Sequence, residues 1–500
     1  MSHVLIDDND TDDSKVVGSN TTFNGNHVPS TPRDFESQLE IFKAVSRFLP
    51  DGNEDESFWW NVTGRHVARM MHEARYPEQR QAELLLFHRF AVVPRLGPKA
   101  TSAEPRFWSR VAPGVGDGSP IGYSWRWGTS AGSKPLIRHY VEPIGTLTGT
   151  PADPLNEGAA KEMLWHLGKL LPTADLSLLW KFAAHIRPVL TDEATRKVAG
   201  SSMLVGLEWA PDSAGTVDVM AGLMTRAPAQ VGSLLGTIFP RAMRDAYGDG
   251  ASLGCLNAVR EFIETDKHGA HLTVLGTTAV DCCSPEASRF KVYVATRKLS
   301  FDHIAAVMTL GGRKPESAET LAQLRELWYD LRGLAADFPT SAEPPDPGAA
   351  KPNGTNGTNG TNGTRAAGRG GPNANVSGVT FYFDIHPKYA APHVKLQVDV
   401  SKHSASDLAA IEAVTRFLTR RGQGRDAQAY MNVLRGMVPE EELRTRRGLQ
   451  AFFAFAAKRG EIDITSYFLP QVYRRFAETE AELSASAPPK GRRRSRFGSY

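Results

Sequence analysis

The feature that most constrains the fold is a pattern that recurs five times along the 500-residue chain. Each copy has two segments with apolar residues at helical spacing (three in the first copy), followed by two short segments rich in β-branched and aromatic residues, which predict paired strands. The predicted helices are 35–48, 57–73 and 78–91, then 157–170 and 174–186, 231–246 and 252–265, 302–309 and 316–336, and 405–421 and 425–437. The predicted strand pairs are 121–127 with 136–142, 202–209 with 216–224, 271–280 with 288–296, 378–385 with 393–400, and 449–457 with 461–468.

A repeat of this kind favours one closed architecture over separate domains. A single hairpin exposes unpaired edges and is marginally stable in water. Hairpins that close into an antiparallel barrel remove every edge. The predicted fold class is therefore α+β: a ten-stranded antiparallel β-barrel built from five helix–helix–strand–strand repeats, with the helices outside.

Three segments fall outside this scheme. Residues 1–33 are rich in Asp, Ser, Asn and Thr and predict a disordered acidic tail, and residues 486–500 predict a basic disordered tail. Residues 338–376 contain four consecutive Asn-Gly-Thr triplets and predict a flexible insertion. The expected domain organisation is a single barrel domain over 34–485.

Composition excludes several classes of protein. A net charge of +3 gives no signature of a nucleic-acid partner. No run approaches the ~20 apolar residues of a membrane span, and the N-terminus lacks the apolar segment of a secretory signal. Three cysteines are too few for a disulfide framework, and the adjacent Cys282 and Cys283 lack zinc-site spacing. We therefore expect a cytoplasmic protein without a metal or cofactor, for which a homodimer is a possible assembly.

The strand at 288–296 reads Ser-Arg-Phe-Lys-Val-Tyr-Val-Ala-Thr. Arg289, Lys291 and Tyr293 share one of its faces, because side chains alternate with a period of two. Taken alone, this face is typical of the solvated side of an amphipathic strand. In a barrel covered by helices the apolar face turns outward, so the two cations and the phenol should point into the lumen, where they suit a multiply charged anion.

Other strands carry candidates of the same kind. Arg138, Lys395 and Tyr467 are expected in the lumen, with Gln397 on the same face as Lys395. The aromatic residues Tyr123, Trp125 and Trp127 share one face of the first strand and are expected to form an aromatic wall. Cations can stabilise a departing diphosphate without a metal, aromatic faces can stabilise the allylic cation, and a dry cavity protects it from water.

Several motifs resemble one family. They are Tyr123-Ser-Trp-Arg-Trp, Arg138-His-Tyr-Val-Glu-Pro-Ile, Asp281-Cys-Cys-Ser-Pro-Glu-Ala-Ser-Arg-Phe-Lys-Val-Tyr-Val, Val307-Met-Thr-Leu-Gly-Gly-Arg and Lys458-Arg-Gly-Glu. Together, over about residues 35–476, they resemble the fungal dimethylallyltryptophan synthase family of aromatic prenyltransferases. The resemblance implies the αββα (ABBA) prenyltransferase barrel. It also implies metal-independent transfer of a dimethylallyl or longer prenyl group from an allylic diphosphate to an aromatic small molecule, in fungal secondary metabolism such as alkaloid biosynthesis.

The resemblance also implies a set of diphosphate-binding residues, with departures. The set is Arg138, Arg289, Lys291, Tyr293, Lys395, Gln397 and Tyr467. The Lys-x-Tyr pair that the family carries on the second hairpin is replaced by Asp218 and Met220. Gln397 and Asp463 stand where the family has tyrosines. The cradle is therefore expected to lack a cation and three shielding rings.

On the acceptor side, Gly122 occupies the position of the glutamate that accepts an indole N–H in the family. With Tyr123 and Trp125, it is expected to bind the acceptor. Ala210 replaces the lysine associated with removal of the ring proton, so Glu208 and Asp218 are the candidate catalytic acids or bases. These departures argue against free tryptophan and favour a bulkier polycyclic or indole-containing natural product.

Two alternative functions stay open. The barrel could catalyse cyclisation or rearrangement of a hydrophobic intermediate without releasing diphosphate, using Asp218 and Asp463 as general acids. A non-catalytic scaffold could instead bind a partner through the Asn-Gly-Thr insertion or through the basic tail, which is also consistent with nuclear localisation.

Overall fold

The computed structural model describes residues 39–101, 107, 109, 116–128, 133–186, 201–212, 216–224, 232–345, 378–458 and 460–486. The predicted tail at 1–33, residues 346–376 of the predicted insertion and the tail from 487 onward lie outside the described residues.

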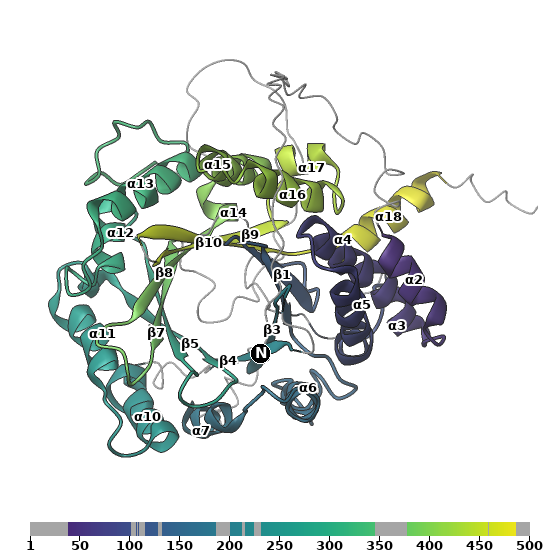
Figure 1. Ribbon diagram of the computed structural model, residues 1–500, viewed down its shortest axis with the longest axis horizontal. Coiled ribbons are helices and arrows are strands. Elements are labelled where there is room, and N and C mark those ends of the chain that lie inside the picture. The colour runs from purple at the N-terminus through teal and green to yellow at the C-terminus, as the bar shows by residue number, and fades with distance from the viewer. Residues whose placement is uncertain are drawn as a thin grey trace, which may run out of the picture.

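Ten strands form one closed antiparallel barrel, as the repeat predicts (Figure 1). The strands are β1 (Ile121–Arg126), β2 (Leu136–Val141), β3 (Met203–Trp209), β4 (Asp218–Met224), β5 (Thr273–Asp281), β6 (Phe290–Thr296), β7 (Val379–Ile385), β8 (His393–Asp399), β9 (Gln450–Lys458) and β10 (Glu461–Phe468). Each strand pairs with the next along the chain, and β1 pairs with β10 to close the ring.

Helices surround the barrel (Figure 1). They are α2 (Glu40–Phe48), α3 (Glu54–Trp59), α4 (Arg65–Glu73), α5 (Glu78–Phe87), α6 (Glu157–Leu170), α7 (Ser177–Ile186), α10 (Phe239–Tyr247), α11 (Gly254–Thr265), α12 (Phe301–Met308), α13 (Ala318–Arg332), α14 (Val400–His403), α15 (Asp407–Arg420), α16 (Gly424–Arg435), α17 (Glu440–Thr445) and α18 (Val472–Ser486). Short π-helical turns, η1 (Trp60–Gly64), η2 (His88–Val92) and η4 (Leu234–Ile238), adjoin α3, α5 and α10. The 3₁₀ turns η3 (Val93–Arg95) and η5 (Gly269–His271) complete the set.

The helix pattern of the sequence is found, with three additions. The periodicity does not predict α14, α17 or α18, which are short or follow the last strand. Helix α18 lies beside α2 and α3 in an outer layer (Figure 1), where Phe476 meets Phe58 edge to face at 5.9 Å between ring centroids. Residues 338–345, the first part of the predicted insertion, are described and pack on α13: Tyr329 Oη donates a hydrogen bond to the carbonyl of Phe338.

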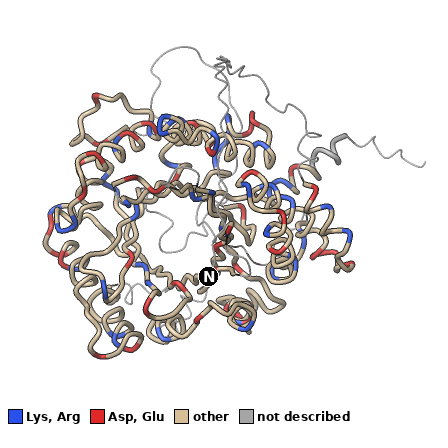
Figure 2. The backbone as a smooth tube through the Cα atoms, viewed as in Figure 1, with Lys and Arg blue, Asp and Glu red and all other residues tan. Residues whose placement is uncertain are grey.

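The core lies between the barrel and the helices, so the strands turn their apolar faces outward. On β6, Phe290, Val292 and Val294 are completely buried. The Phe290 ring lies 4.7 Å from Phe182 of α7 and 5.3 Å from Phe239 of α10. The polar face of the strand is thereby directed into the barrel, as the sequence predicts. Charged residues accordingly occur on the inner ring of strands as well as on the outer helices (Figure 2).

A bulge interrupts β5 next to this strand. Val274 pairs with Val294 and Thr278 pairs with Val292, so three residues of β5 stand opposite Tyr293 alone. Bulges bend a strand and re-aim its side chains. Here the bulge brings Leu275 and Thr277 into the lining of the lumen.

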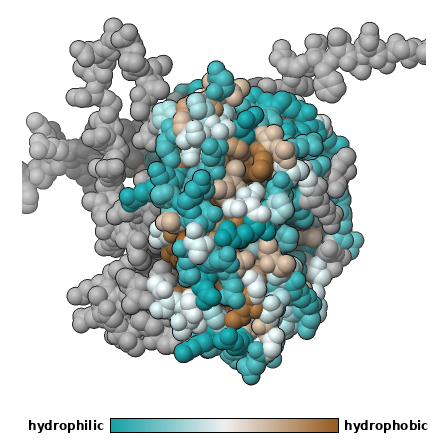
Figure 3. Space-filling model, turned by 90° about the vertical axis from the view of Figure 1, so that its left-hand side faces the viewer, coloured by the Kyte–Doolittle hydropathy of each residue, from teal (hydrophilic) through white to brown (hydrophobic). Residues whose placement is uncertain are grey.

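The outer surface is mostly hydrophilic where α11, α12 and α13 cover the barrel, with small apolar patches between polar residues (Figure 3). Within the part of the chain that the structure describes, every helix is too short or too polar to cross a bilayer.

Two histidines are completely buried between the barrel and η2. His139 of β2 lies against Trp209 of β3 at 4.1 Å between ring centroids, with the two rings tilted, and meets His88 of η2 edge to face at 5.1 Å. Neither ring nitrogen of His139 has a hydrogen-bond partner among the described residues, whereas His88 Nε2 lies 2.8 Å from Thr63 Oγ1. Burial lowers the pKa of His88 to about 3, and burial together with His88 lowers the pKa of His139 far below its usual range.

These histidines predict acid-sensitive stability. Their folded-state pKa values lie below the unfolded value of about 6.5, so the unfolded chain binds more protons below that pH. The contribution of the two neutral histidines to the free energy of unfolding is therefore complete above pH 6.5 and is lost as the pH falls toward 3. Between pH 7 and pH 5, each histidine should lower the free energy of unfolding by about 2 kcal/mol. The replacement His139→Phe should remove the contribution of His139 to this pH dependence. It should also stabilise the protein at pH 5, because it eliminates an unpartnered buried polar ring.

Urea unfolding at pH 7 and pH 5 measures both effects. The matched control is His72→Gln, which replaces an exposed histidine of α4 and leaves both buried rings in place. An equal loss of stability between pH 7 and pH 5 in wild type and His139→Phe would contradict the assignment.

Candidate active site

A cavity of about 450 Å³ fills the lumen, and all ten strands contribute to its lining. Its charged residues gather near the end where each odd-numbered strand turns into the next, which we call the hairpin end; they include Arg126, Arg138, Asp281, Arg289, Lys291, Asp384, Lys395 and Asp463. The opposite end, called the far end, is lined mainly by small or apolar residues; they include Gly122, Leu204, Gly222, Met224, Leu275, Ala295 and Ala451. Asp399 and Lys402 are charged exceptions at the far end and pair with each other at 3.0 Å. The lumen thus changes from charged to apolar along its axis.

Arg289 and Lys291, the cations at the start of β6, are both held by Asp281. Lys291 Nζ lies 2.5 Å from Asp281 Oδ1, and Arg289 Nη2 lies 2.8 Å from Asp281 Oδ2. Arg289 also approaches Asp384 Oδ2 at 3.3 Å. Burial opposes ionisation of Asp281, but the two cations outweigh it and lower its pKa to about 2. This wall therefore carries the two fixed cations that the sequence predicts. It also carries two carboxylates, Asp281 and Asp384, that the sequence does not predict.

The opposite wall repeats this arrangement on β1 and β2, which lie five and four strands away from β6 around the ring. Arg126 binds Asp463 of β10 through Nε at 3.0 Å and Nη2 at 2.5 Å. Arg138 forms an ion pair with Glu208 of β3. Burial raises the pKa of each carboxylate, but the neighbouring cations outweigh it, so the pKa values of both Glu208 and Asp463 are lowered. The resemblance marks Asp463 as an added anion; the structure shows that Arg126 neutralises it.

Lys395 has a different environment. It lies on β8, is 8% exposed, and donates a hydrogen bond to Thr465 Oγ1 at 3.2 Å. Burial lowers its pKa to about 8, with Asp463 opposing that effect and Arg138 and Arg126 adding to it. Gln397 follows on the same face and also lines the cavity.

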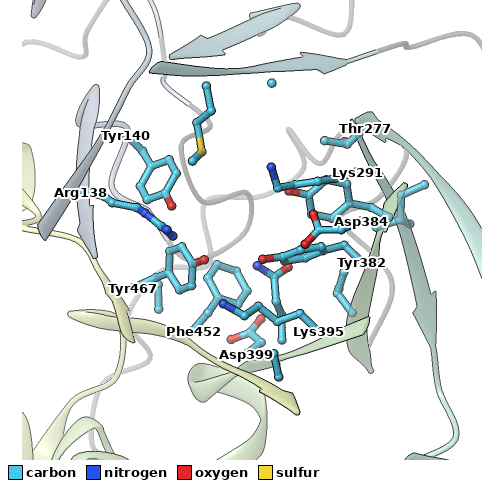
Figure 4. A pocket seen from close by; sticks show the side chains of 18 of the residues that line it. Arg138, Tyr140, Thr277, Lys291, Tyr382, Asp384, Lys395, Asp399, Phe452 and Tyr467 are labelled. Carbon is cyan, nitrogen blue, oxygen red and sulfur yellow. The ribbon is translucent and has the colours of Figure 1, made fainter. Parts of the chain in front are cut away.

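Aromatic rings form the middle of the lumen. Tyr140 faces Tyr467 at 5.6 Å between ring centroids, and Tyr293 faces Tyr382 at 5.3 Å. Figure 4 shows Tyr140, Tyr382, Tyr467 and Phe452 around the cavity. Burial raises the pKa of Tyr293, Tyr382 and Tyr467, so these phenols stay neutral and can donate hydrogen bonds.

The prediction of a depleted set of rings is therefore only partly right. Tyr140 and Tyr382 line the lumen and were not predicted. The period-two rule would have found both: Tyr140 follows Arg138 by two residues, and Tyr382 lies between Thr380 and Asp384 on one face of a strand whose other face is apolar.

The predicted aromatic wall on β1 is wrong. Tyr123, Trp125 and Trp127 do share a face, but this face points outward to the helices. Trp125 and Trp127 pack on Tyr430 of α16 at 5.8 and 4.9 Å between ring centroids, and Tyr123 Oη lies 3.3 Å from His66 Nδ1 of α4. The physical reason is that these large rings belong to the core, whereas the lumen face of β1 carries Gly122, Ser124 and Arg126. Trp125 does not line the cavity, whereas Tyr123 is among its lining residues although its hydroxyl meets His66 of α4.

The candidate catalytic carboxylates lie at the hairpin end. Glu208 stands directly opposite Asp218 in the pairing of β3 with β4, and Arg138 holds it. Asp218 is exposed, and partial desolvation with the charges of Glu208 and Asp281 raises its pKa. Neither carboxylate is among the residues that line the cavity, whereas Gly122 does line it.

The Arg126–Asp463 pair should stabilise the barrel closure. The change Asp463→Asn leaves Arg126 without its counter-charge and should lower the free energy of unfolding by about 2 to 4 kcal/mol. The double variant Arg126→Gln with Asp463→Asn should recover part of the loss, since the uncompensated cation is then absent. Urea unfolding of the wild type, both single variants and the double variant measures the coupling. Losses that simply add would show that the two residues do not interact.

Comparisons with known proteins identify relatives of the chain. The sequence model of the family described as tryptophan dimethylallyltransferase matches residues 55–433. Prenyltransferase vrtC of Penicillium aethiopicum is 66% identical over 475 residues, covering 93% of this chain and 96% of its own. Prenyltransferase nscD of Neosartorya fischeri is 51% identical over 477 residues, covering 95% of this chain and 98% of its own.

Solved structures share the fold at low sequence identity. AnaPT from Neosartorya fischeri superposes with a TM-score of 0.66 at 22% identity, covering 86% of this chain and 97% of its own. NotF in complex with brevianamide F and DMSPP superposes with a TM-score of 0.67 at 20% identity, covering 87% of this chain and 99% of its own.

Proposed function

Because the chain belongs to the tryptophan dimethylallyltransferase family of prenyltransferases, we propose that it transfers a dimethylallyl or longer prenyl group from an allylic diphosphate to a polycyclic aromatic acceptor. The observation that carries this proposal is the gradient along the lumen, from cations through tyrosines to small and apolar residues. An allylic diphosphate has the same order of groups: an anion, an allylic carbon and a hydrocarbon tail. The donor therefore fits with its diphosphate at the hairpin end.

In this arrangement the diphosphate binds between the two cationic walls. Arg289 and Lys291 contact it from β6, Arg138 contacts it from β2, and Tyr293 and Tyr467 donate hydrogen bonds. As the allylic carbon–oxygen bond breaks, its electron pair moves to the diphosphate, where fixed cations stabilise the added charge. Asp281 and Asp384 keep these cations in place before the donor arrives, and on binding they share them with the diphosphate.

The rings in the middle of the lumen suit the cation that remains. Tyr140, Tyr293, Tyr382 and Tyr467 can present their faces to an allylic cation, which cation–π contact stabilises. Walls that are closed on all sides by paired strands limit the access of water, which would otherwise capture the cation.

The acceptor then binds beside the allylic carbon, with its hydrocarbon rings toward the apolar part of the lumen. Gly122 supplies no carboxylate for an indole N–H, and together with Gly222 it leaves room for a broad ring system. A ring carbon forms the new bond to the allylic carbon. Glu208 lies behind Arg138, outside the present lining of the cavity, so it can take the ring proton only after Arg138 has turned toward the diphosphate. Asp218 stands opposite Glu208 and can pass the proton to solvent.

The test combines donors and acceptors. The full chain is incubated with dimethylallyl or geranyl diphosphate and, separately, with dihydroxynaphthalenes, a hydroxyanthraquinone or tryptophan. We expect release of diphosphate and a product heavier by the prenyl group with the polycyclic acceptors, and little turnover with tryptophan. No diphosphate from either donor with any acceptor would contradict the proposal and favour the cyclisation alternative.

A variant in the cradle sharpens this test. The change Lys291→Met keeps the length of the side chain but removes a cation from the diphosphate site. It should lower turnover by about 10² to 10³ and weaken binding of dimethylallyl thiolodiphosphate. The matched control is Lys298→Met, an exposed lysine just beyond the same strand, which should change neither quantity. Undiminished turnover by Lys291→Met would show that Lys291 of β6 does not bind the diphosphate.

A further inference from the structure

Lys395 differs from the other cations at the hairpin end of the cavity. Arg126, Arg138, Arg289 and Lys291 each form an ion pair with a carboxylate. Among the described residues, Lys395 has no carboxylate oxygen within 4.0 Å and instead donates to the hydroxyl of Thr465. Its neighbour Asp463 is directed to Arg126, which binds both carboxylate oxygens. Lys395 is therefore a buried amine with bonding capacity that the protein leaves unused.

The space around this amine suits a flat ring. In the strand pairing, Lys395 lies between Tyr382 of β7 and Ala456 of β9. Ala456 and Ala457 are small and line the cavity. Figure 4 shows the Lys395 amine directed into the cavity, which Phe452 and Tyr467 also line. A ring that stacks against these aromatic side chains would bring an edge substituent to the amine.

The charges near Lys395 act in opposite directions on its ammonium form. Arg126 of β1 and Arg138 of β2 disfavour the ammonium, whereas Asp463 of β10 and Asp384 of β7 favour it. The polar groups around it include the Thr465 hydroxyl and the Tyr382 phenol, which is neutral. His393 and Gln397 flank Lys395 on the same face of β8 and also line the cavity. Because burial brings the pKa of Lys395 to about 8, both the amine and the ammonium are accessible near neutral pH. An amine in this position can accept a proton from an acidic hydroxyl.

We propose that the Lys395 amine, positioned by its hydrogen bond to Thr465, forms a subsite for an acidic hydroxyl group of the aromatic acceptor, a phenol or an enol, and takes the proton of that hydroxyl. This inference rests on the proposed prenyl transfer and specifies its acceptor class. It departs from the role that the family resemblance gives to Lys395, which is to bind the diphosphate of the donor. The diphosphate site then consists of the cations of β6 and Arg138.

The chemistry balances as follows. The Lys395 amine takes the hydroxyl proton, and the electron pair of the O–H bond stays on the oxygen. The oxyanion feeds electron density into the ring, and a ring carbon bonds to the allylic carbon as the bond to diphosphate breaks. Glu208 takes the proton of that ring carbon, and the Lys395 ammonium returns its proton to the oxygen. The subsite thus raises the nucleophilicity of the ring and fixes which edge of the acceptor meets the donor.

The wild-type protein provides the first test. 2-Naphthol is a neutral molecule in water at pH 7, and its oxyanion absorbs at longer wavelength. Titration of the protein with 2-naphthol at pH 7, in the presence of dimethylallyl thiolodiphosphate, should produce the absorption of the oxyanion. The methyl ether of 2-naphthol should bind at least tenfold more weakly. Binding of 2-naphthol without the oxyanion band would overturn the proposal.

The second test separates the two roles of Lys395. The variant Lys395→Met should lose the oxyanion band and bind 2-naphthol at least tenfold more weakly, while its affinity for dimethylallyl thiolodiphosphate stays within twofold of wild type. Lys298→Met should match wild type in both. A tenfold loss of affinity for the thiolodiphosphate, or unchanged binding of 2-naphthol, would overturn the proposal. If Lys395→Met fails to fold, as judged by its thermal melting, the oxyanion band of the wild type decides.

The outcome is distinct from that of the proposed function. Binding and absorption are measured without turnover, so they remain interpretable if no diphosphate is released from any donor. In that case the hydroxyl subsite would be supported and the prenyl transfer would be contradicted. Diphosphate release together with absence of the oxyanion band would give the reverse result.

Discussion

The structure depends on the hydrogen-bonded pairing of its first strand with its last. β1 and β10 are neighbours in the barrel although Arg126 and Asp463 are separated by 337 residues in sequence. This pairing removes the two edges that an open sheet would expose and turns a curved surface into an enclosed lumen. Every feature of the candidate site follows from it, because a group that faces inward on any strand then meets groups from the opposite wall.

Enclosure also determines the electrostatics. A cation in a lumen of low dielectric constant needs a counter-charge, and four of the arginines and lysines have one in Asp281, Asp463 or Glu208. These carboxylates come from strands adjacent to their partners, so the charges are balanced locally around the ring. Such pairs hold long side chains in place before a ligand binds. The same balance leaves Lys395 as the cation whose environment differs, which is why it carries a separate inference.

The sequence predicts the architecture well, because the alternation of helical and strand periods survives in every repeat. It also places Arg289, Lys291 and Tyr293 correctly, since the helices outside require the apolar face of β6 to turn outward. The same rule places Trp125 of β1 in the core, because its ring shares a face with the buried Ile121. Gly122 and Arg126 occupy the face that lines the lumen. The ion pairs could not be predicted. Arg126 and Asp463 meet only because the barrel closes, and no local pattern links residues so far apart in the chain.

The closure between β1 and β10 also sets the order in which the protein can assemble. During synthesis, Arg126 leaves the ribosome 337 residues before Asp463. At about 5–20 residues per second, this interval is roughly 20 to 70 s. Throughout it β1 remains an open edge with an unpaired cation, and contacts of such long sequence separation form slowly. Until the last hairpin is synthesised, β1 therefore exposes an unpaired edge, and such edges favour association with other chains.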